Sequence, residues 1–133
     1  MIFPSTIPLL EPETQPRGPH DWTTNLDVMQ TLQAGWNGYE AEPPSELALE
    51  TARRFIAVLE SESLPPTRVA PSVVGGVGIT RKVGERRVYV EFYNDGSVHS
   101  LFAEGEEAET AAVAPTSEGF LAIASRMRAY LDA

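Results

Sequence analysis

Residues 77–103 read VGITRKVGERRVYVEFYNDGSVHSLFA, and this stretch decides the fold of the 133-residue chain. Its apolar residues alternate with polar ones, which is typical of strands with one buried face, because successive side chains of a strand point to opposite sides. The apolar sets are Val77 and Ile79, then Val88, Val90 and Phe92, then Val98 and Phe102. Turn residues separate them at Gly84 and at Asn94-Asp95-Gly96. We therefore predict an antiparallel three-stranded meander with one apolar face that other segments cover.

The second turn also predicts the pairing of the strands. A three-residue loop with Gly96 in the left-handed region is a favoured hairpin type. It pairs Phe92 with Val98 and keeps the apolar face continuous, whereas a two-residue loop would mix the two faces. On this register Glu91 lies opposite His99 on the other side of the sheet.

The flanking segments predict helices that can cover the apolar face. The clearest helix spans residues 46–60, with Ser45 as its N-cap. Its apolar stripe consists of Ala48, Ala52, Phe55, Ile56 and Leu59. A short helix over residues 23–34, capped by Thr24, precedes it, and a third helix follows over residues 116–131.

Two further segments lie between these elements. Residues 68–73 predict an edge strand, since Pro71 cannot donate to a sheet ladder. Residues 104–115 read as an acidic connection without strand structure. The fold class expected is α+β, with two N-terminal helices, an antiparallel meander of three to four strands and one C-terminal helix.

The first residues have a different composition. Five prolines fall within residues 1–20, which excludes a helix or a central strand. We expect a Pro-rich arm over residues 1–22 and a single α+β domain over residues 23–133. The segment lacks a basic leader and its apolar run is broken by prolines, so we expect neither a signal peptide nor a membrane span, and a cytoplasmic location.

Composition narrows the function classes. The chain has no Cys, which removes disulfides and thiolate chemistry. Its net charge is −9, which disfavours general nucleic-acid binding. Residues 67–103 nevertheless hold five Lys or Arg against three Asp or Glu, so a mildly basic sheet lies between acidic flanks. The acidic flanks favour a protein partner with a basic surface.

The segment after the first expected helix reads GWNGYEAEPPS over residues 35–45. It resembles the GWDGYGA-x-P-P-S segment of a loosely defined set of short bacterial proteins often found near mobile-element genes. The resemblance covers about residues 24–103 and departs at Asn37, usually Asp, and at Glu40, usually Gly. It implies the same order of helices and strands and a mobile-element setting. No activity is established for the set, so it implies no site residues.

Two aromatic residues of this segment, Trp36 and Tyr39, are secondary candidates for binding. Gly35 and Gly38 permit positive φ, and Asn37-Gly38 is a turn dipeptide, so the segment predicts a structured bend. The aromatic rings then serve as anchors for the loop. The alternative is an aromatic ligand pocket.

The non-apolar side of the meander carries the main candidates, which are Tyr89, Glu91, Tyr93, His99 and Leu101. Tyrosine is enriched at recognition interfaces, so these residues predict a binding surface if no other segment covers them. Glu91 beside His99 is also the pattern of a small enzyme with a general base, although no nucleophile motif accompanies it. An ordinary cross-strand pair is the simpler interpretation.

The remaining patterns give a basic hairpin and no metal site. The residues Arg81, Lys82, Arg86 and Arg87 cluster at one hairpin. They could contact nucleic-acid phosphates or pair with the acidic residues of the same chain. His20 and His99 are the only histidines and match no ligand spacing, so we expect no metal and no cofactor.

The sequence therefore predicts a small acidic protein-binding module without catalysis of its own. It would act by occupying a partner, as an antitoxin, an immunity protein or an inhibitor of a defence system does. An enzyme using Glu91 and His99, and a nucleic-acid contact through residues 81–87, are the alternatives. An uncovered strand edge or aromatic face would also permit a homodimer.

Overall fold

The computed structural model describes residues 22–38 and 41–132. The Pro-rich arm expected over residues 1–22 lies outside them except for Trp22, the first residue of helix α1. Tyr39 and Glu40 also lie outside the described residues. None of the helices within the described ranges is both long and apolar enough to cross a membrane.

Residues 22–38 and 41–132 form an α+β fold with three helices and one five-stranded antiparallel sheet. The elements are α1 (Trp22–Met29), α2 (Glu46–Ser61), β1 (Arg68–Pro71), β2 (Val77–Val83), β3 (Arg86–Phe92), β4 (Val98–Glu104), β5 (Glu107–Val113) and α3 (Ser117–Leu131). The strands follow one another in the order β1-β2-β3-β4-β5, as a meander does. The α+β class and the antiparallel meander are confirmed, while the described sheet has five strands instead of the three to four expected.

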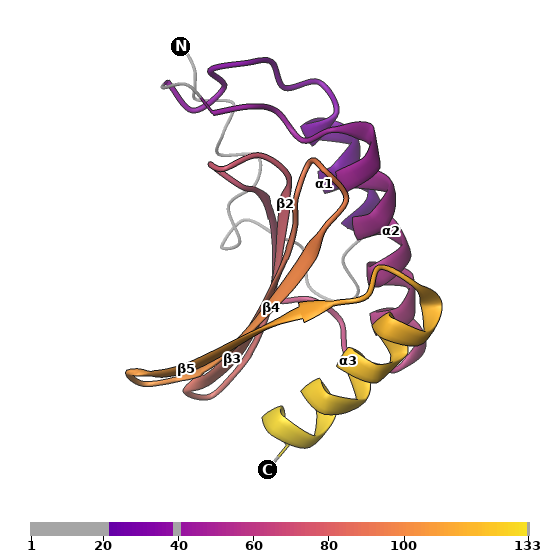
Figure 1. The fold of residues 1–133 in the computed structure, drawn as a ribbon, viewed down its shortest axis with the longest axis vertical. Helices are drawn as coiled ribbons and strands as arrows, with labels where there is room; N and C mark the ends of the chain where they lie inside the picture. The colour runs from indigo at the N-terminus through magenta and orange to yellow at the C-terminus, as the bar shows by residue number, and fades with distance from the viewer. Residues whose placement is uncertain (1–21, 39–40, 133) are drawn as a thin grey trace.

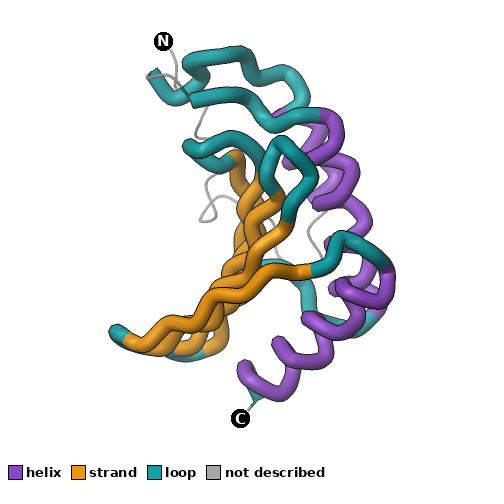
Figure 2. The backbone as a smooth tube through the Cα atoms, in the orientation of Figure 1, coloured by secondary structure: helices purple, strands orange, loops and turns teal. Residues whose placement is uncertain are grey.

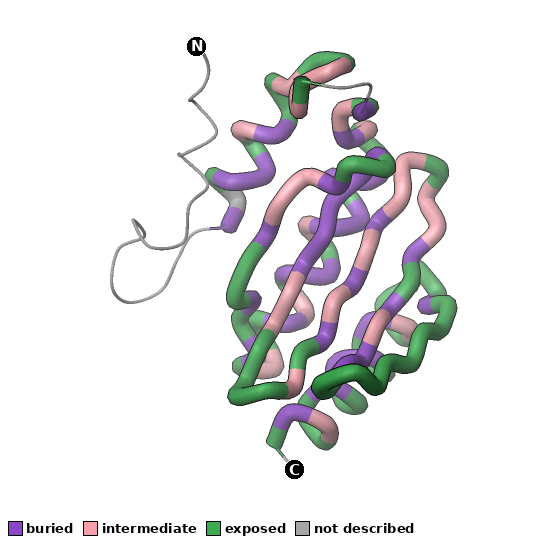
Figure 3. Tube along the Cα trace, turned by 90° about the vertical axis from the view of Figure 1, so that its left-hand side faces the viewer, coloured by how far each residue is buried: buried purple, intermediate pink, exposed green. Residues whose placement is uncertain are grey.

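The helices form one layer and the sheet forms the other (Figure 1). All three helices lie on the same side of the sheet, and the β2–β3 and β4–β5 hairpins extend away from them (Figures 1 and 2). The opposite side of the sheet faces the viewer in Figure 3, with the helices behind it. We call these two sides the helical face and the open face of the sheet.

The core lies between the helical face and the helices. Its centre is a group of three rings, Phe55 from α2, Phe92 from β3 and Phe120 from α3, whose centroids are 5.3 to 6.2 Å apart. All three side chains are fully buried. Tilted and edge-on aromatic pairs at this spacing add about 0.5–1.5 kcal/mol each beyond the area that they bury.

The predicted register of the meander is confirmed. Phe92 pairs with Val98, Val88 with Phe102, and Glu91 with His99. Gly96 has φ +94°, as the three-residue loop requires. Strand β1 is an edge strand and includes Pro71, also as expected, although it ends there and not at residue 73.

The two longer helices agree with the sequence patterns. Helix α2 begins after Ser45, whose hydroxyl accepts a hydrogen bond from the Ala48 amide. Helix α3 begins after Thr116, whose hydroxyl accepts one from the Gly119 amide. Such caps satisfy amide groups that have no partner within the helix.

The expectations for the first helix are wrong in two respects. Helix α1 ends at Met29 instead of residue 34, and Thr24 lies inside the helix instead of capping it. The amides of Thr31 and Leu32 bond to carbonyls three residues back, and the Thr31 hydroxyl donates to the Val28 carbonyl at 2.6 Å. These bonds satisfy the last carbonyls and stop the helix early.

The expected acidic connection over residues 104–115 is also wrong, because residues 107–113 form strand β5. Every residue of β5 pairs with one of β4, from Glu104 with Glu107 to Val98 with Val113. Only Val113 of the strand is buried. Backbone pairing at an exposed sheet edge therefore forms this strand, without the apolar alternation that marks the others.

Candidate binding face

Cross-strand pairing arranges the open face in rows that run across the sheet. One row reads Lys82, Arg87, Ala103 and Ala108; the next reads Arg68, Thr80, Tyr89, Leu101 and Thr110; the third reads Ala70, Gly78, Glu91, His99 and Ala112. Tyr93 follows Glu91 on the same side of β3, beside the β3–β4 turn. The five main candidates thus lie together on the open face.

Tyr89 lies across the neighbouring strand. Gly78 is the partner of Glu91 in the sheet, and a Cβ atom placed on Gly78 would lie 2.7 Å from Cε1 and 2.8 Å from Cζ of Tyr89. The ring therefore occupies the space that any other residue at position 78 would fill, and a strand glycine often marks such a close approach.

The phenol group of Tyr89 is coupled to Glu91. Burial, together with the Glu91 charge and a hydrogen bond to that carboxylate, raises the pKa of Tyr89 from its ordinary 10.0 to about 12, while a hydrogen bond with Ser72 acts in the opposite direction. The raised value means that Tyr89 is a neutral hydrogen-bond donor throughout the physiological range.

The Glu91 carboxylate faces β1 and not β4. The Ser72 hydroxyl donates a hydrogen bond to Oε2 of Glu91. Ser72 is buried, Glu91 is half-buried, and no Lys, Arg or His of the described ranges forms an ion pair with Glu91. Hydroxyl donors hold this carboxylate at the middle of the open face without neutralising its charge.

His99 is the cross-strand partner of Glu91 but does not pair with it through side chains. The imidazole is exposed and meets the Tyr93 ring edge-on, with 5.3 Å between the centroids. Partial burial and the charges of Glu91 and Asp95 raise the pKa of Tyr93. A carboxylate within hydrogen-bond distance would hold the imidazole in position for general-base catalysis. The geometry thus brings Glu91 and His99 to adjacent positions, with Glu91 bonded to Ser72 and His99 in contact with Tyr93.

The secondary aromatic candidate Trp36 closes its own loop. Its indole N–H donates to the Glu42 carbonyl at 3.0 Å, and the Gly35 amide bonds to the Ala41 carbonyl at 2.9 Å. Gly35 and Gly38 have φ of +78° and +85°, which the bend predicted here requires. Trp36 therefore anchors the segment, while its companion Tyr39 lies outside the described residues.

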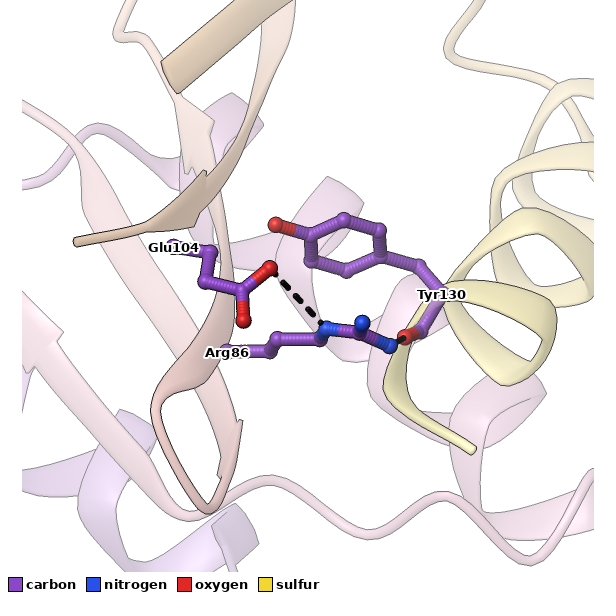
Figure 4. A network of polar contacts seen from close by, with 3 residues as sticks. All are labelled: Arg86, Glu104 and Tyr130. Carbon is purple, nitrogen blue, oxygen red and sulfur yellow. Dashed lines mark hydrogen bonds and ion pairs between the residues drawn. The ribbon is translucent and has the colours of Figure 1, made fainter. Parts of the chain in front are cut away.

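The basic hairpin of residues 81–87 is divided between the two sides of the sheet. Arg81 and Arg86 lie on the helical face, two residues along the strand from the buried Ile79 and Val88, and Arg81 donates to the Pro65 carbonyl at 2.6 Å. Arg86 bonds to Glu104 at 3.2 Å and to the Tyr130 carbonyl at 2.9 Å, as Figure 4 shows. Lys82 and Arg87 lie on the open face. The four basic residues that cluster in the sequence are therefore two separate pairs, and Arg86 forms the expected kind of ion pair with an acidic residue of the same chain.

Three residues that matter here were not among the sequence candidates. Ser72 and Gly78 shape the surroundings of Glu91, and Asn94 joins the β3–β4 turn to helix α2. The Asn94 side chain accepts from the Ser45 amide at 2.7 Å and donates to the Pro43 carbonyl at 3.0 Å. A glycine inside an alternating strand, opposite a tyrosine-rich strand, is the signal that could have identified Gly78.

Comparisons with known proteins add no further constraint. The chain matches no family model, no curated protein and no solved structure.

Within residues 22–38 and 41–132, no group of three or more His, Asp or Glu residues gathers as a metal site would require.

Proposed function

We propose that this protein is a small acidic binding module that occupies a protein partner through the open face. The binding centre is the group Tyr89, Glu91, Tyr93, His99 and Leu101. The partner presents a basic side chain, preferably arginine, to the Glu91 carboxylate. The proposal needs no catalytic step.

The observation that carries this proposal is the state of Glu91. Its carboxylate is half-buried and receives hydrogen bonds from hydroxyl groups only. No Lys, Arg or His side chain of the described residues forms an ion pair with it. A charge held in fixed geometry and partly removed from water interacts more strongly with an incoming cation than a fully solvated charge does.

The side chains around Glu91 suit the same kind of partner. Arginine forms paired hydrogen bonds with carboxylates and stacks on aromatic rings. Tyr93 and His99 provide such rings beside Glu91, and Leu101 adds an apolar contact in the adjacent row. Tyrosine and arginine dominate the binding energy of many protein interfaces.

The net charge of −9 agrees with a basic partner, because it accelerates association with a positively charged protein. Together with the resemblance to short bacterial proteins near mobile-element genes, it supports an antitoxin, an immunity protein or an inhibitor of a defence system as the class. In each of these classes the protein acts by covering a functional surface of another protein.

The test is affinity capture from the native host, followed by calorimetric titration of the purified partner. Tyr93→Ala and Glu91→Gln each remove one feature of the centre, and Gly78→Ala displaces the Tyr89 ring without changing any charge. We expect each to weaken binding at least tenfold. Leu121→Ala and Glu60→Gln are matched controls, because both residues are exposed on the helical layer. They should leave the affinity within twofold.

Two results would overturn the proposal. One is the absence of any stoichiometric partner in capture with the wild-type protein. The other is a partner that tolerates changes at Glu91 and Tyr93 but is lost with the helical-layer controls, which would assign binding to the opposite side of the molecule. Circular dichroism of every variant excludes a loss of folding as the cause.

A further inference from the structure

Most basic side chains of the described residues have a contact within the protein. The residues with such contacts are Arg53 with Asp27, Arg54 with the Phe120 ring, Arg81 with the Pro65 carbonyl, Arg86 with Glu104, Arg126 with Glu109, and Arg128 with Glu62. Among the described cations, the three without a side-chain partner are Arg68, Lys82 and Arg87. All three lie on the open face.

Lys82 and Arg87 are direct cross-strand partners on β2 and β3. Like charges at opposed positions of a sheet repel each other and destabilise the pairing. The chain has nineteen acidic residues, and Glu85 lies in the turn between these two cations, yet none of the described acids pairs with either. An anion between the two side chains would remove the repulsion.

The surroundings of this pair leave room for an anion. A hollow of about 280 Å³ lies at this end of the sheet, and it is lined by Lys82, Gly84, Glu85, Arg87, Ala103 and Gly105. Ala103, the β4 partner of Arg87, contributes only a methyl group to this lining. The two glycines belong to the β2–β3 and β4–β5 turns and contribute no side chain.

We propose that Lys82 and Arg87 bind a compact tetrahedral dianion of the phosphate type. The planar guanidinium of Arg87 can donate two parallel hydrogen bonds to such a group, while the Lys82 ammonium supplies a second charge. A phosphate monoester carries nearly two negative charges at neutral pH, so it can pair with both cations, while the Glu85 carboxylate in the same lining opposes its binding. This site is separate from the binding centre around Glu91 and does not depend on the proposed function.

A nucleic-acid backbone is a poor occupant of the same site. Its affinity comes mainly from the number of phosphates that basic side chains neutralise. Only Lys82 and Arg87 are available at this hairpin, because Arg81 and Arg86 are engaged on the helical face. The net charge of −9 repels an extended polyanion but repels a single dianion much less.

The experiment is a titration of the full chain with inorganic phosphate, observed by ¹H–¹⁵N NMR at pH 7.5 and constant ionic strength. We expect saturable shifts confined to the amides of residues 82–87 and 103–105, and similar shifts with sulfate but not with chloride. Lys82→Gln/Arg87→Gln should raise the dissociation constant at least tenfold. Arg68→Gln, which removes the unpaired cation of the adjacent row, should change it less than twofold.

The double variant removes a repulsion between exposed side chains, so its melting temperature in chloride should equal or exceed that of the wild type. Added phosphate should raise the melting temperature of the wild type but not of the variant. Shifts that chloride reproduces, or that persist in the double variant, would overturn the proposal. If a 20-nucleotide oligonucleotide of mixed sequence binds more tightly than phosphate at physiological salt, the site is a nucleic-acid site and not a phosphate site.

Discussion

Tyr89 is the residue that reports most directly on the geometry of the open face. Its ring lies over Gly78 and its hydroxyl group reaches Glu91, so any rearrangement of this region changes the environment of the phenol. The raised pKa of about 12 is the measurable consequence. Burial is its first cause, and the Glu91 carboxylate is the second.

This pKa predicts a loss of stability in alkali. Between pH 10 and 12 the folded protein keeps the Tyr89 proton while the unfolded chain has released it, so the free energy of unfolding falls as pH rises. Solvent screening reduces the effect of the two-unit difference to about 1–2 kcal/mol. We therefore expect the free energy of unfolding to fall by about 1–2 kcal/mol more in the wild type than in Tyr89→Phe between pH 10 and 12. Urea denaturation at a series of pH values measures this difference.

Glu91→Gln provides the control for the cause of the shift. Removing the charge should lower the pKa of Tyr89 below 12, yet leave it above 10.0, because burial remains. Absorbance titration at the phenolate wavelength measures this value. Identical alkaline curves for the wild type and Tyr89→Phe would show that the phenol is solvated and that its position over Gly78 is wrong.

Asn94 joins two elements that are far apart in the sequence, the β3–β4 turn and the start of helix α2. Its amide group bonds to both Ser45 and Pro43. We expect Asn94→Ala to lower the free energy of unfolding by about 2 kcal/mol, since a half-buried hydrogen bond contributes about 1 kcal/mol. Asn94→Asp keeps the acceptor for the Ser45 amide and places a negative charge at a helix N-terminus, so its cost should be smaller. Equal losses in urea denaturation would contradict the role of the Ser45 bond.

The β4–β5 hairpin depends on its turn. Gly105 has φ +61°, a value that residues with a side chain rarely adopt, and the next residue, Glu106, has ordinary φ. Nothing lies within 4 Å of a Cβ placed on Gly105, so a substitution there meets backbone strain alone. Gly105→Ala should cost about 1–2 kcal/mol, whereas Glu106→Ala in the same turn should stay within about 0.5 kcal/mol. Thermal unfolding compares them, and equal effects would reject this turn geometry.

Strand β5 also marks the limit of what the sequence could predict. Apolar alternation predicted β2, β3, β4 and their register, because a buried face imposes a period of two. Strand β5, Glu107–Val113, has no such pattern, since almost the whole strand is exposed. The remaining signal is Gly105-Glu106, which repeats the Gly84-Glu85 pair of the β2–β3 turn. Comparing the two turns would have predicted the fifth strand.

The sequence also predicted only part of the candidate site. Alternation and register placed the five main candidates on one face. The direction of the Glu91 side chain could not be deduced, because it depends on the approach of Ser72 across Gly78. The division of the basic hairpin followed from alternation alone, since neighbouring residues of a strand point to opposite sides. Charged residues that are consecutive in a strand therefore form two groups, one on each face of the sheet.

For the molecule as a whole, the decisive feature is that one side of a five-stranded sheet bears all the described helices. The helical face and the open face should respond differently to the same kind of change. Val90 is fully buried against the helices, whereas Leu101, in the adjacent strand, is half-buried on the open face. Removing a buried methyl or methylene group costs about 1 kcal/mol or more, and leaves a cavity that adds to the loss.

We expect Val90→Ala to lower the free energy of unfolding by about 2 kcal/mol and Leu101→Ala by less than about 1 kcal/mol, although leucine loses more atoms. Urea denaturation at two protein concentrations measures both. A loss at Leu101 as large as that at Val90 would mean that the open face is covered in solution, and dependence of that loss on concentration would identify a second copy of the chain as the cover. Either result would contradict the proposal that the open face is available to a different protein. A small loss that does not depend on concentration would mean that Tyr93, His99 and Leu101 are free to bind such a partner.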